Sequence, residues 1–292
     1  MADMVITSAL IKQLRDKTGV GLMDCKRALE ATEGNVDAAI EHLRKKGAAI
    51  GQKRADRVTK EGVIITRVGD NATTGALVEI NCETDFVARS EDFLCFANAV
   101  AAAVQEKQPD NVNAVNALVT STGKTVADLQ NDLLARVGEK VEVRRFAIFQ
   151  TNNGLISSYT HLGNKIGVLV DIGGLSVDDA NLGVGRDVAM QIAAMNPLVI
   201  SRDQIDKNLI EREVEIYRTQ ARNENRPAAI VDKIAAGRLE KFYQEVSLLE
   251  QTFIKDSGMT VNDYLREGGV RSGQAVSVNR FHRFYLGEET TK

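Results

Sequence analysis

One pattern of apolar residues occurs twice along the chain, and each copy has the order strand, turn, strand, helix. The first copy covers 62–106 and turns around Gly69, and the second covers 154–195 and turns around Gly163. Two strands joined by a short glycine turn form an antiparallel pair, and a repeated unit folds into similar lobes. We therefore predict the α+β class, with a duplicated two-lobe core of antiparallel sheets and helices.

The segment Asn81–Arg89 joins the second strand to the helix in the first copy, and Ser90 is a suitable N-cap for that helix. This short link carries Asp85 and Phe86, an acid and a large aromatic residue that a simple turn does not need. Phe86 either fills the local core or points outward as a wedge for a partner. The equivalent link of the second copy, 173–177, has no Asp-Phe pair, which weakens the core alternative.

Residues 6–46 have the pattern of three short helices. Ser8 is expected to cap the first, Gly19 and Gly21 separate it from the second over Leu22–Ala31, and Asn35 caps the third. The pair Gly19 and Gly21 is not a dinucleotide-binding fingerprint, because it follows a helix and lacks the third glycine.

The segment from Gly47 to Lys60 is rich in basic residues and lacks the periodic apolar pattern of a helix or strand. We interpret this segment as a mobile, solvated connector and not as a binding site. It marks a boundary between domains.

A second helical module covers 201–246. Ser201 to Gln204 resembles a capping box, and Pro227 suits the first position of a second helix. The pattern predicts a protruding antiparallel hairpin of the coiled-coil type. Its narrow apolar seam either packs the two helices against each other or forms a dimer contact.

The remaining segments complete the core. Thr125 is expected to cap a helix that Gly138 ends, and 140–150 is strand-like. After the hairpin, 246–254 is expected to be extended, Thr260 to cap a short helix, and 275–286 to form the last strand. Lys124 is not in a phosphate loop, because Leu118 stands where that motif needs glycine.

These patterns divide the chain into six segments. They are a three-helix domain (1–52), a basic linker (53–60), core lobe 1 (61–150), core lobe 2 (151–200), the helical hairpin inserted in lobe 2 (201–246), and the return of lobe 2 with a tail (247–292).

Several functional classes are disfavoured by composition. A net charge of -3 and the absence of Trp argue against direct nucleic-acid binding. The N-terminus has no apolar signal region and no run is long enough to span a membrane, so we expect a cytoplasmic protein without a membrane partner. Three widely spaced cysteines predict neither a disulfide framework nor a zinc site.

The three histidines, His42, His161 and His282, lie in none of the common catalytic or metal-binding motifs. The carboxylates are scattered and form no acid–base pair. We therefore predict a binding protein, with no catalytic residue, metal or cofactor. One alternative is a passive adaptor that binds ubiquitin-like or other helical partners through its three-helix unit.

Four motifs resemble the elongation factor Ts family in the same order, and the resemblance extends from about Thr7 to Leu286. The motifs are Thr18–Leu29, Thr84–Ala88, Val137–Glu139 followed by Val143–Arg145, and Ser158–His161 followed by Ile166–Val170. The first motif and the Thr-Asp-Phe-Val loop are each specific.

The resemblance implies a guanine nucleotide exchange factor that binds the GDP-bound translational GTPase elongation factor Tu and promotes GDP release in translation elongation. It also implies a ubiquitin-associated (UBA)-like N-terminal domain and a coiled-coil hairpin. In this family the loop that corresponds to Thr84, Asp85, Phe86 and Val87 intrudes beside the magnesium ion of the partner. Further partner contacts are implied for Lys26, Val137, Gly138, His161 and Ile254. Lys255 departs from the family pattern, since some members have an apolar pair there.

Overall fold

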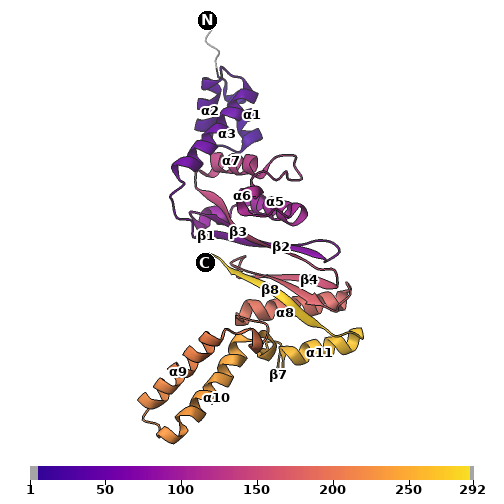
Figure 1. Cartoon of the computed structure of the whole chain (residues 1–292). Helices are drawn as coiled ribbons and strands as arrows, with labels where there is room; N and C mark the ends of the chain where they lie inside the picture. Colours follow the sequence, from indigo (N-terminus) through magenta and orange to yellow (C-terminus); the bar gives the residue numbers. More distant parts are fainter. Residues whose placement is uncertain (1–5, 290–292) are drawn as a thin grey trace.

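The computed structural model describes residues 6–289, apart from the side chains of Asp179, Arg271 and Ser272. The molecule is elongated, with a three-helix unit at one end, two stacked sheets in the middle and a helical hairpin projecting at the other end (Figure 1). The predicted α+β class with antiparallel sheets is confirmed.

The N-terminal unit consists of three helices, α1 (Ser8–Thr18), α2 (Leu22–Ala31) and α3 (Val36–Lys53). Asn35 caps α3 as predicted. The cap of α1 is Thr7 and not Ser8, because the Thr7 hydroxyl accepts a hydrogen bond from the amide of Leu10. These helices enclose a small core of their own around Leu14, Cys25 and Leu29.

Helix α3 continues to Lys53, so the connector that we expected from Gly47 begins only after this helix. The reason is tertiary packing. Gly47 is buried against helix α7 (Val126–Val137), and a Cβ atom there would lie 2.1 Å from the carbonyl oxygen of Asn131. Close approach of the two backbones therefore stabilises the last turns of α3, although their sequence has no clear apolar periodicity.

Lobe 1 contains a three-stranded sheet in the order β1-β2-β3, from Glu61–Val68, Thr74–Cys82 and Val141–Gln150. Helices α4 (Asp85–Ala88), α5 (Glu91–Lys107), α6 (Val112–Val115) and α7 lie between β2 and β3 in the sequence. Side chains alternate along the strands. Val63 and Val78 face a core shared with Phe93 of α5, whereas Ile64 and Leu77 face the other lobe.

Lobe 2 repeats this arrangement with the sheet order β4-β5-β8, from Gly154–His161, Ile166–Gly173 and Ser277–Tyr285. Its helices are α8 (Asp179–Met195) and α11 (Val261–Ser272), and a small two-stranded sheet is formed by β6 (Thr252–Phe253) and β7 (Asp256–Thr260). As predicted, Thr260 caps α11, where it forms a capping box with Asp263.

The two sheets stack face to face through equivalent glycines (Figure 1). A Cβ atom on Gly75 would meet Ile156 and Leu169, and one on Gly167 would meet Ile64 and Leu77. Because each glycine receives the branched side chains of the opposite sheet, the sheets approach closely over a shared apolar layer.

A buried carboxylate lies at a β-bulge in each sheet, Glu79 in β2 and Asp171 in β5. Arg145 binds Glu79 at 2.6 Å, and its guanidinium lies 4.2 Å from the centre of the Phe284 ring in the other lobe. Arg280 binds Asp171 at 3.1 Å and lies 4.4 Å from the Phe149 ring. Each ion pair lies within one lobe, and its arginine packs on an aromatic ring of the other lobe, so the cation–π contacts tie the lobes together.

The hairpin is formed by α9 (Lys207–Asn223) and α10 (Ala228–Val246). The predicted capping box at Ser201 is wrong. Residues Arg202–Gln204 form a separate short 3-10 helix, and Asp206 caps α9 through the amides of Asn208 and Leu209. Pro227 occupies the N-cap position of α10 and not its first helical position.

The chain re-enters lobe 2 after α10. The segment that we expected to be extended contains a second 3-10 helix, Leu248–Glu250, before β6. The amide of Ser247 donates to the carbonyl oxygen of Tyr243, and the amide of Leu248 donates to the carbonyl oxygen of Val199. After β8, the carbonyl oxygen of Glu288 accepts a hydrogen bond from Arg144, and the rest of the predicted tail lies partly outside the described residues.

Candidate partner-binding site

Phe86 lies on a single helical turn, α4, between β2 and α5. The Thr84 hydroxyl caps this turn by accepting from the amide of Val87, and Ser90 caps α5 as predicted. Val87 and Ala88 enter the core of lobe 1, whereas the Phe86 side chain is 85% exposed. The core alternative for Phe86 is therefore wrong. Val87 is a buried residue of this turn. Its side chain packs in the core beneath the turn and is not available to contact a partner.

Two glutamates hold this turn against the segment that follows α7. The Glu83 carboxylate accepts a hydrogen bond from the backbone amide of Lys140 at 2.7 Å. In return, the Glu139 carboxylate accepts from the Thr84 amide at 3.1 Å and from the Thr84 hydroxyl at 3.0 Å. We call this pair of reciprocal bonds the glutamate clamp (Glu83, Thr84, Glu139 and Lys140). Charge-assisted bonds of this kind fix a loop more firmly than neutral ones do.

The clamp brings two of the predicted contact residues, Val137 and Gly138, beside the Phe86 turn. Val137 is the last residue of α7, and Gly138 ends that helix in the left-handed conformation, with φ of 69°. A side chain at Gly138 would meet no atom within 4 Å, so this glycine is required by backbone conformation and not by crowding.

The basic connector is bound to the same place. Arg54 donates two hydrogen bonds to Glu83, at 2.8 and 2.9 Å, and Arg57 donates one at 3.1 Å. Lys140 extends its ammonium group back to the carbonyl oxygens of Ala55 and Arg57, at 2.8 and 3.1 Å. The prediction of a solvated connector is therefore wrong for this stretch, because its cations neutralise a largely buried carboxylate at the base of the Phe86 turn.

Electrostatics keep Glu83 of the clamp ionised. Burial tends to raise the pKa of Glu83, but the hydrogen bonds from the Lys140 amide, Arg54 and Arg57 outweigh it and hold this pKa below the usual range. Beneath the turn, burial and then the charge of Glu139 raise the pKa of the Cys82 thiol to about 12. Cys82 is thus a neutral core residue near pH 7 and no nucleophile.

Asp85 faces solvent beside Phe86, and its carboxylate lies 3.0 Å from the guanidinium of Arg89, one turn further along the chain. Both side chains of this ion pair are exposed, so the pair contributes little to stability. Asp85 can therefore exchange Arg89 for another partner at small cost.

His161 ends β4 on the same side of the molecule as Phe86. The turn that follows it contacts the start of β1, where the carbonyl of Asn164 accepts from the amide of Ile64 at 2.7 Å. Residue Glu61, at the first position of β1, pairs across the sheet with Cys82, which directly precedes the clamp. The His161 ring is exposed, and its Nδ1 atom lies 3.1 Å from the Tyr159 hydroxyl.

Ile254 and Lys26 lie on other parts of the molecule. Ile254 is partly exposed between β6 and β7, and its amide donates to Gln191 of α8 at 2.8 Å. The neighbouring Lys255 is paired with Asp187. Lys26 is exposed on α2 of the N-terminal unit and lies 3.7 Å from Glu30. The structure therefore places Val137 and Gly138 beside Phe86 through the glutamate clamp and His161 at the same end of the sheets, whereas Lys26 lies on the N-terminal unit and Ile254 between β6 and β7.

Sequence reasoning missed the glutamate clamp. Glu83 directly precedes the Thr84–Ala88 motif and Glu139 ends the Val137–Glu139 motif, but they are far apart in the sequence, and no spacing rule pairs an acid with an amide at that separation. The only available signal was that each acid directly adjoins a predicted contact residue.

Comparison with known proteins identifies the family. Residues 83–288 match the family model described as Elongation factor TS. Elongation factor Ts of Chloroherpeton thalassium is 44% identical over 287 residues, which cover 97% of this chain and 99% of the relative. The proteins of the same name from Prosthecochloris aestuarii (46% over 286 residues, 97% and 99% covered) and a strain of Clostridium botulinum (43% over 288 residues, 99% and 95% covered) agree.

The chain belongs to the elongation factor Ts family. Membership supports a role in translation elongation. The elongation factor Ts relatives also match the N-terminal unit, which lies outside the matched range of the family model. Within residues 6–289, no helix is both long and apolar enough to cross a membrane.

Proposed function

We propose that this chain is a guanine nucleotide exchange factor that binds elongation factor Tu carrying GDP and promotes GDP release, without catalysing a chemical reaction. The observation that carries the proposal is the exposure of Phe86 on a turn that is capped, clamped and anchored in the core. An exposed aromatic side chain on a rigid support is suited to inserting into a partner, because little conformational entropy is lost on binding.

The proposed mechanism acts on the phosphate site of the partner. Bound Mg²⁺ and backbone N–H groups hold GDP there electrostatically, so a small displacement of either removes much of the affinity. Phe86 would supply the displacement, and the Asp85 carboxylate would bond with or repel groups beside it. Val137, Gly138 and His161 would complete the contact at the same end of the sheets, while Lys26 and Ile254 would touch more distant parts of the partner.

Linkage makes the complex transient. If the factor lowers the affinity of the partner for GDP, GDP must lower the affinity of the partner for the factor by the same ratio. Either ligand then speeds the release of the other, and the nucleotide supply sets the direction of exchange. The test is the release of fluorescent GDP from purified elongation factor Tu, with and without this protein.

The finer assignments of the fold belong to the same proposal. The N-terminal helices would be a UBA-like domain, and α9 and α10 a coiled coil whose outer face could serve a homodimer. A cytoplasmic location follows from the proposed partner. Segment boundaries at residues 52, 60, 150, 200 and 246 stay predictions, with the connector shortened by the extension of α3 to Lys53.

Removing the clamp should slow exchange without unfolding the protein. Thr84→Val deletes the hydroxyl that caps α4 and binds Glu139, and Glu139→Gln deletes the charge of that acceptor. Each change should lower the GDP release rate by about threefold to tenfold, which corresponds to roughly 1 kcal/mol of lost cap and charge-assisted bonding. Stopped-flow release of fluorescent GDP measures the effect.

Thr125→Val is the matched control, because it removes the N-cap of α7 at the end distant from Gly138. We expect a similar loss of stability, about 1 kcal/mol, and an unchanged release rate. Equal slowing in Thr125→Val and Thr84→Val would contradict a specific role for the clamp.

A further inference from the structure

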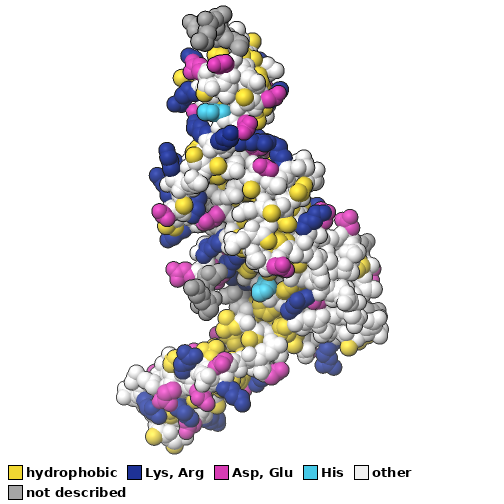
Figure 2. All heavy atoms as spheres, turned by 45° about the horizontal axis from the view of Figure 1, so that its top comes forward, with side chains coloured by type: hydrophobic (Ala, Val, Ile, Leu, Met, Phe, Trp, Pro, Cys, Tyr) yellow, Lys and Arg dark blue, Asp and Glu magenta, His cyan; other side chains and the backbone are white. Residues whose placement is uncertain are grey.

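A small pocket lies where the N-terminal unit meets lobe 1. It is lined by residues of α1, α3 and α7, by Val20 between α1 and α2, and by Lys124, which precedes α7, and its volume is about 50 Å³. That volume holds roughly three to five water-sized positions. Figure 2 shows dark-blue Lys and Arg side chains gathered at the junction between the N-terminal helices and the rest of the body.

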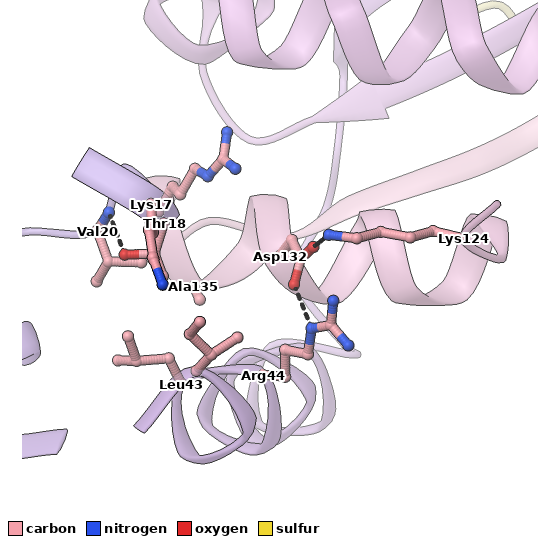
Figure 3. Close-up of a pocket in the computed structure, with 10 residues that line it drawn as sticks. Lys17, Thr18, Val20, Leu43, Arg44, Lys124, Asp132 and Ala135 are labelled. Atoms are coloured by element: carbon pink, nitrogen blue, oxygen red, sulfur yellow. Dashed lines mark hydrogen bonds and ion pairs between the residues drawn. The ribbon is translucent and has the colours of Figure 1, made fainter. Parts of the chain in front are cut away.

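Four cationic side chains line this pocket, against a single lining acid. They are Lys17 of α1, Arg44 of α3, Lys124, and Arg136 of α7, and the acid is Asp132. Figure 3 shows Lys17 on one side of the opening, with Arg44 and Lys124 on the other side around Asp132.

Three carboxylates, those of Asp132, Asp128 and Asp92, lie near these four cations and do not fully neutralise them. Asp132 accepts from Arg44 Nε at 3.0 Å and from Lys124 Nζ at 2.7 Å, so one acid serves two cations. Arg136 is paired with Asp92. Among the described residues, Lys17 has no ion-pair partner, and Arg44 reaches Asp132 only through Nε. An excess of positive charge and unused guanidinium N–H groups therefore remain at the pocket.

Apart from Thr18, whose hydroxyl donates to the carbonyl oxygen of Leu14, the rest of the lining is apolar. Val20, Leu43 and Ala135 are buried there and belong to the core of the N-terminal unit. An apolar lining lowers the local dielectric constant and so strengthens the attraction between the cations and an anion. It offers no polar groups that would recognise a large ligand.

We propose that this pocket binds a phosphate-sized oxyanion, held by Lys17 and by the terminal amino groups of Arg44, with Lys124 and Arg136 supplying further positive charge. Guanidinium and ammonium groups are the side chains best suited to phosphate oxygens. Since Lys17 and Arg44 come from the N-terminal unit and Lys124 and Arg136 from lobe 1, a bound anion would link the two parts across their junction. This proposal is independent of the exchange function.

Titration of the full-length protein with inorganic phosphate at constant ionic strength tests the site. We expect saturable shifts of the backbone amide signals of Lys17, Arg44 and Ala135 in NMR spectra, and none with sodium chloride of equal ionic strength. Lys17→Gln keeps a flexible polar side chain, shorter by one atom, and removes its charge. It should weaken phosphate binding by about tenfold, the usual effect of losing one charged hydrogen bond.

Lys12→Gln on the same helix is the control, since Lys12 is exposed and does not line the pocket. It should leave phosphate binding unchanged. A parallel titration with adenosine monophosphate distinguishes the source of the anion. If it binds as tightly as phosphate, the site accepts the phosphate group of a larger molecule. If it does not bind, the site is specific for the free ion. Shifts that do not saturate, or equal losses in Lys12→Gln and Lys17→Gln, would overturn the proposal.

Discussion

Phe86→Ala is expected to reduce the rate of GDP release from elongation factor Tu at least tenfold. Phe86 is 85% exposed and is the aromatic side chain at the tip of the clamped turn, so it has the position of an interface anchor. Truncation of such an anchor typically costs about 2 kcal/mol or more. The free energy of unfolding should change by less than about 0.5 kcal/mol, because the side chain contributes little to the core. Stopped-flow release and urea unfolding measure the two effects.

Val270→Ala is the matched control. Val270 is an apolar side chain on α11 with 84% exposure, and it lies outside the group formed by Phe86, Val137, Gly138 and His161. The variant should release GDP at the normal rate and be equally stable. Normal exchange by Phe86→Ala, or equal slowing in both variants, would show that Phe86 is not the wedge.

Glu79→Ala is expected to cause the largest loss of stability. The Glu79 side chain is 0% exposed and accepts from Arg145 at 2.6 Å, from Arg144 at 3.3 Å and from the amide of Gly287 at 3.0 Å. Its removal leaves two arginines without their buried carboxylate, and the deletion of one partner from a buried pair costs about 3–5 kcal/mol. Urea unfolding followed by circular dichroism should show this decrease.

Glu106→Ala removes a glutamate of α5 that is exposed and paired only with the adjacent Lys107 among the described residues. It should change the free energy of unfolding by no more than about 0.5 kcal/mol. If Glu79→Ala were as mild as Glu106→Ala, the buried ion pairs of Glu79 within lobe 1 would not hold the core together.

Features that depend on a few neighbouring residues could be predicted from the sequence. Asn35, Ser90 and Thr125 cap the helices that follow them, and Gly138 ends α7, because each of these effects is complete within one turn of backbone. The order strand, turn, strand, helix was recognised twice for the same reason. Alternation of apolar and polar residues along a strand directly indicates which face of the sheet is buried.

Features set by distant contacts could not be predicted. The segment after Gly47 is helical because α7 packs against it, and Arg54 is bound because Glu83 lies across from it in the folded chain. Nearby caps also compete at the start of α9, where Asp206 and not Ser201 is the N-cap, since the Asp206 carboxylate accepts from two amides at once. For Phe86, only the folded structure decides between core and surface, because Val87 next to it satisfies the same apolar requirement.

The most direct test is the release of fluorescent GDP from purified elongation factor Tu with excess unlabelled nucleotide and increasing amounts of this protein. We expect the release rate to rise with its concentration and to reach saturation, and we expect substoichiometric amounts to discharge all of the labelled GDP, since the complex is transient. A release rate that stays at the spontaneous value over the whole concentration range would contradict the proposed exchange function.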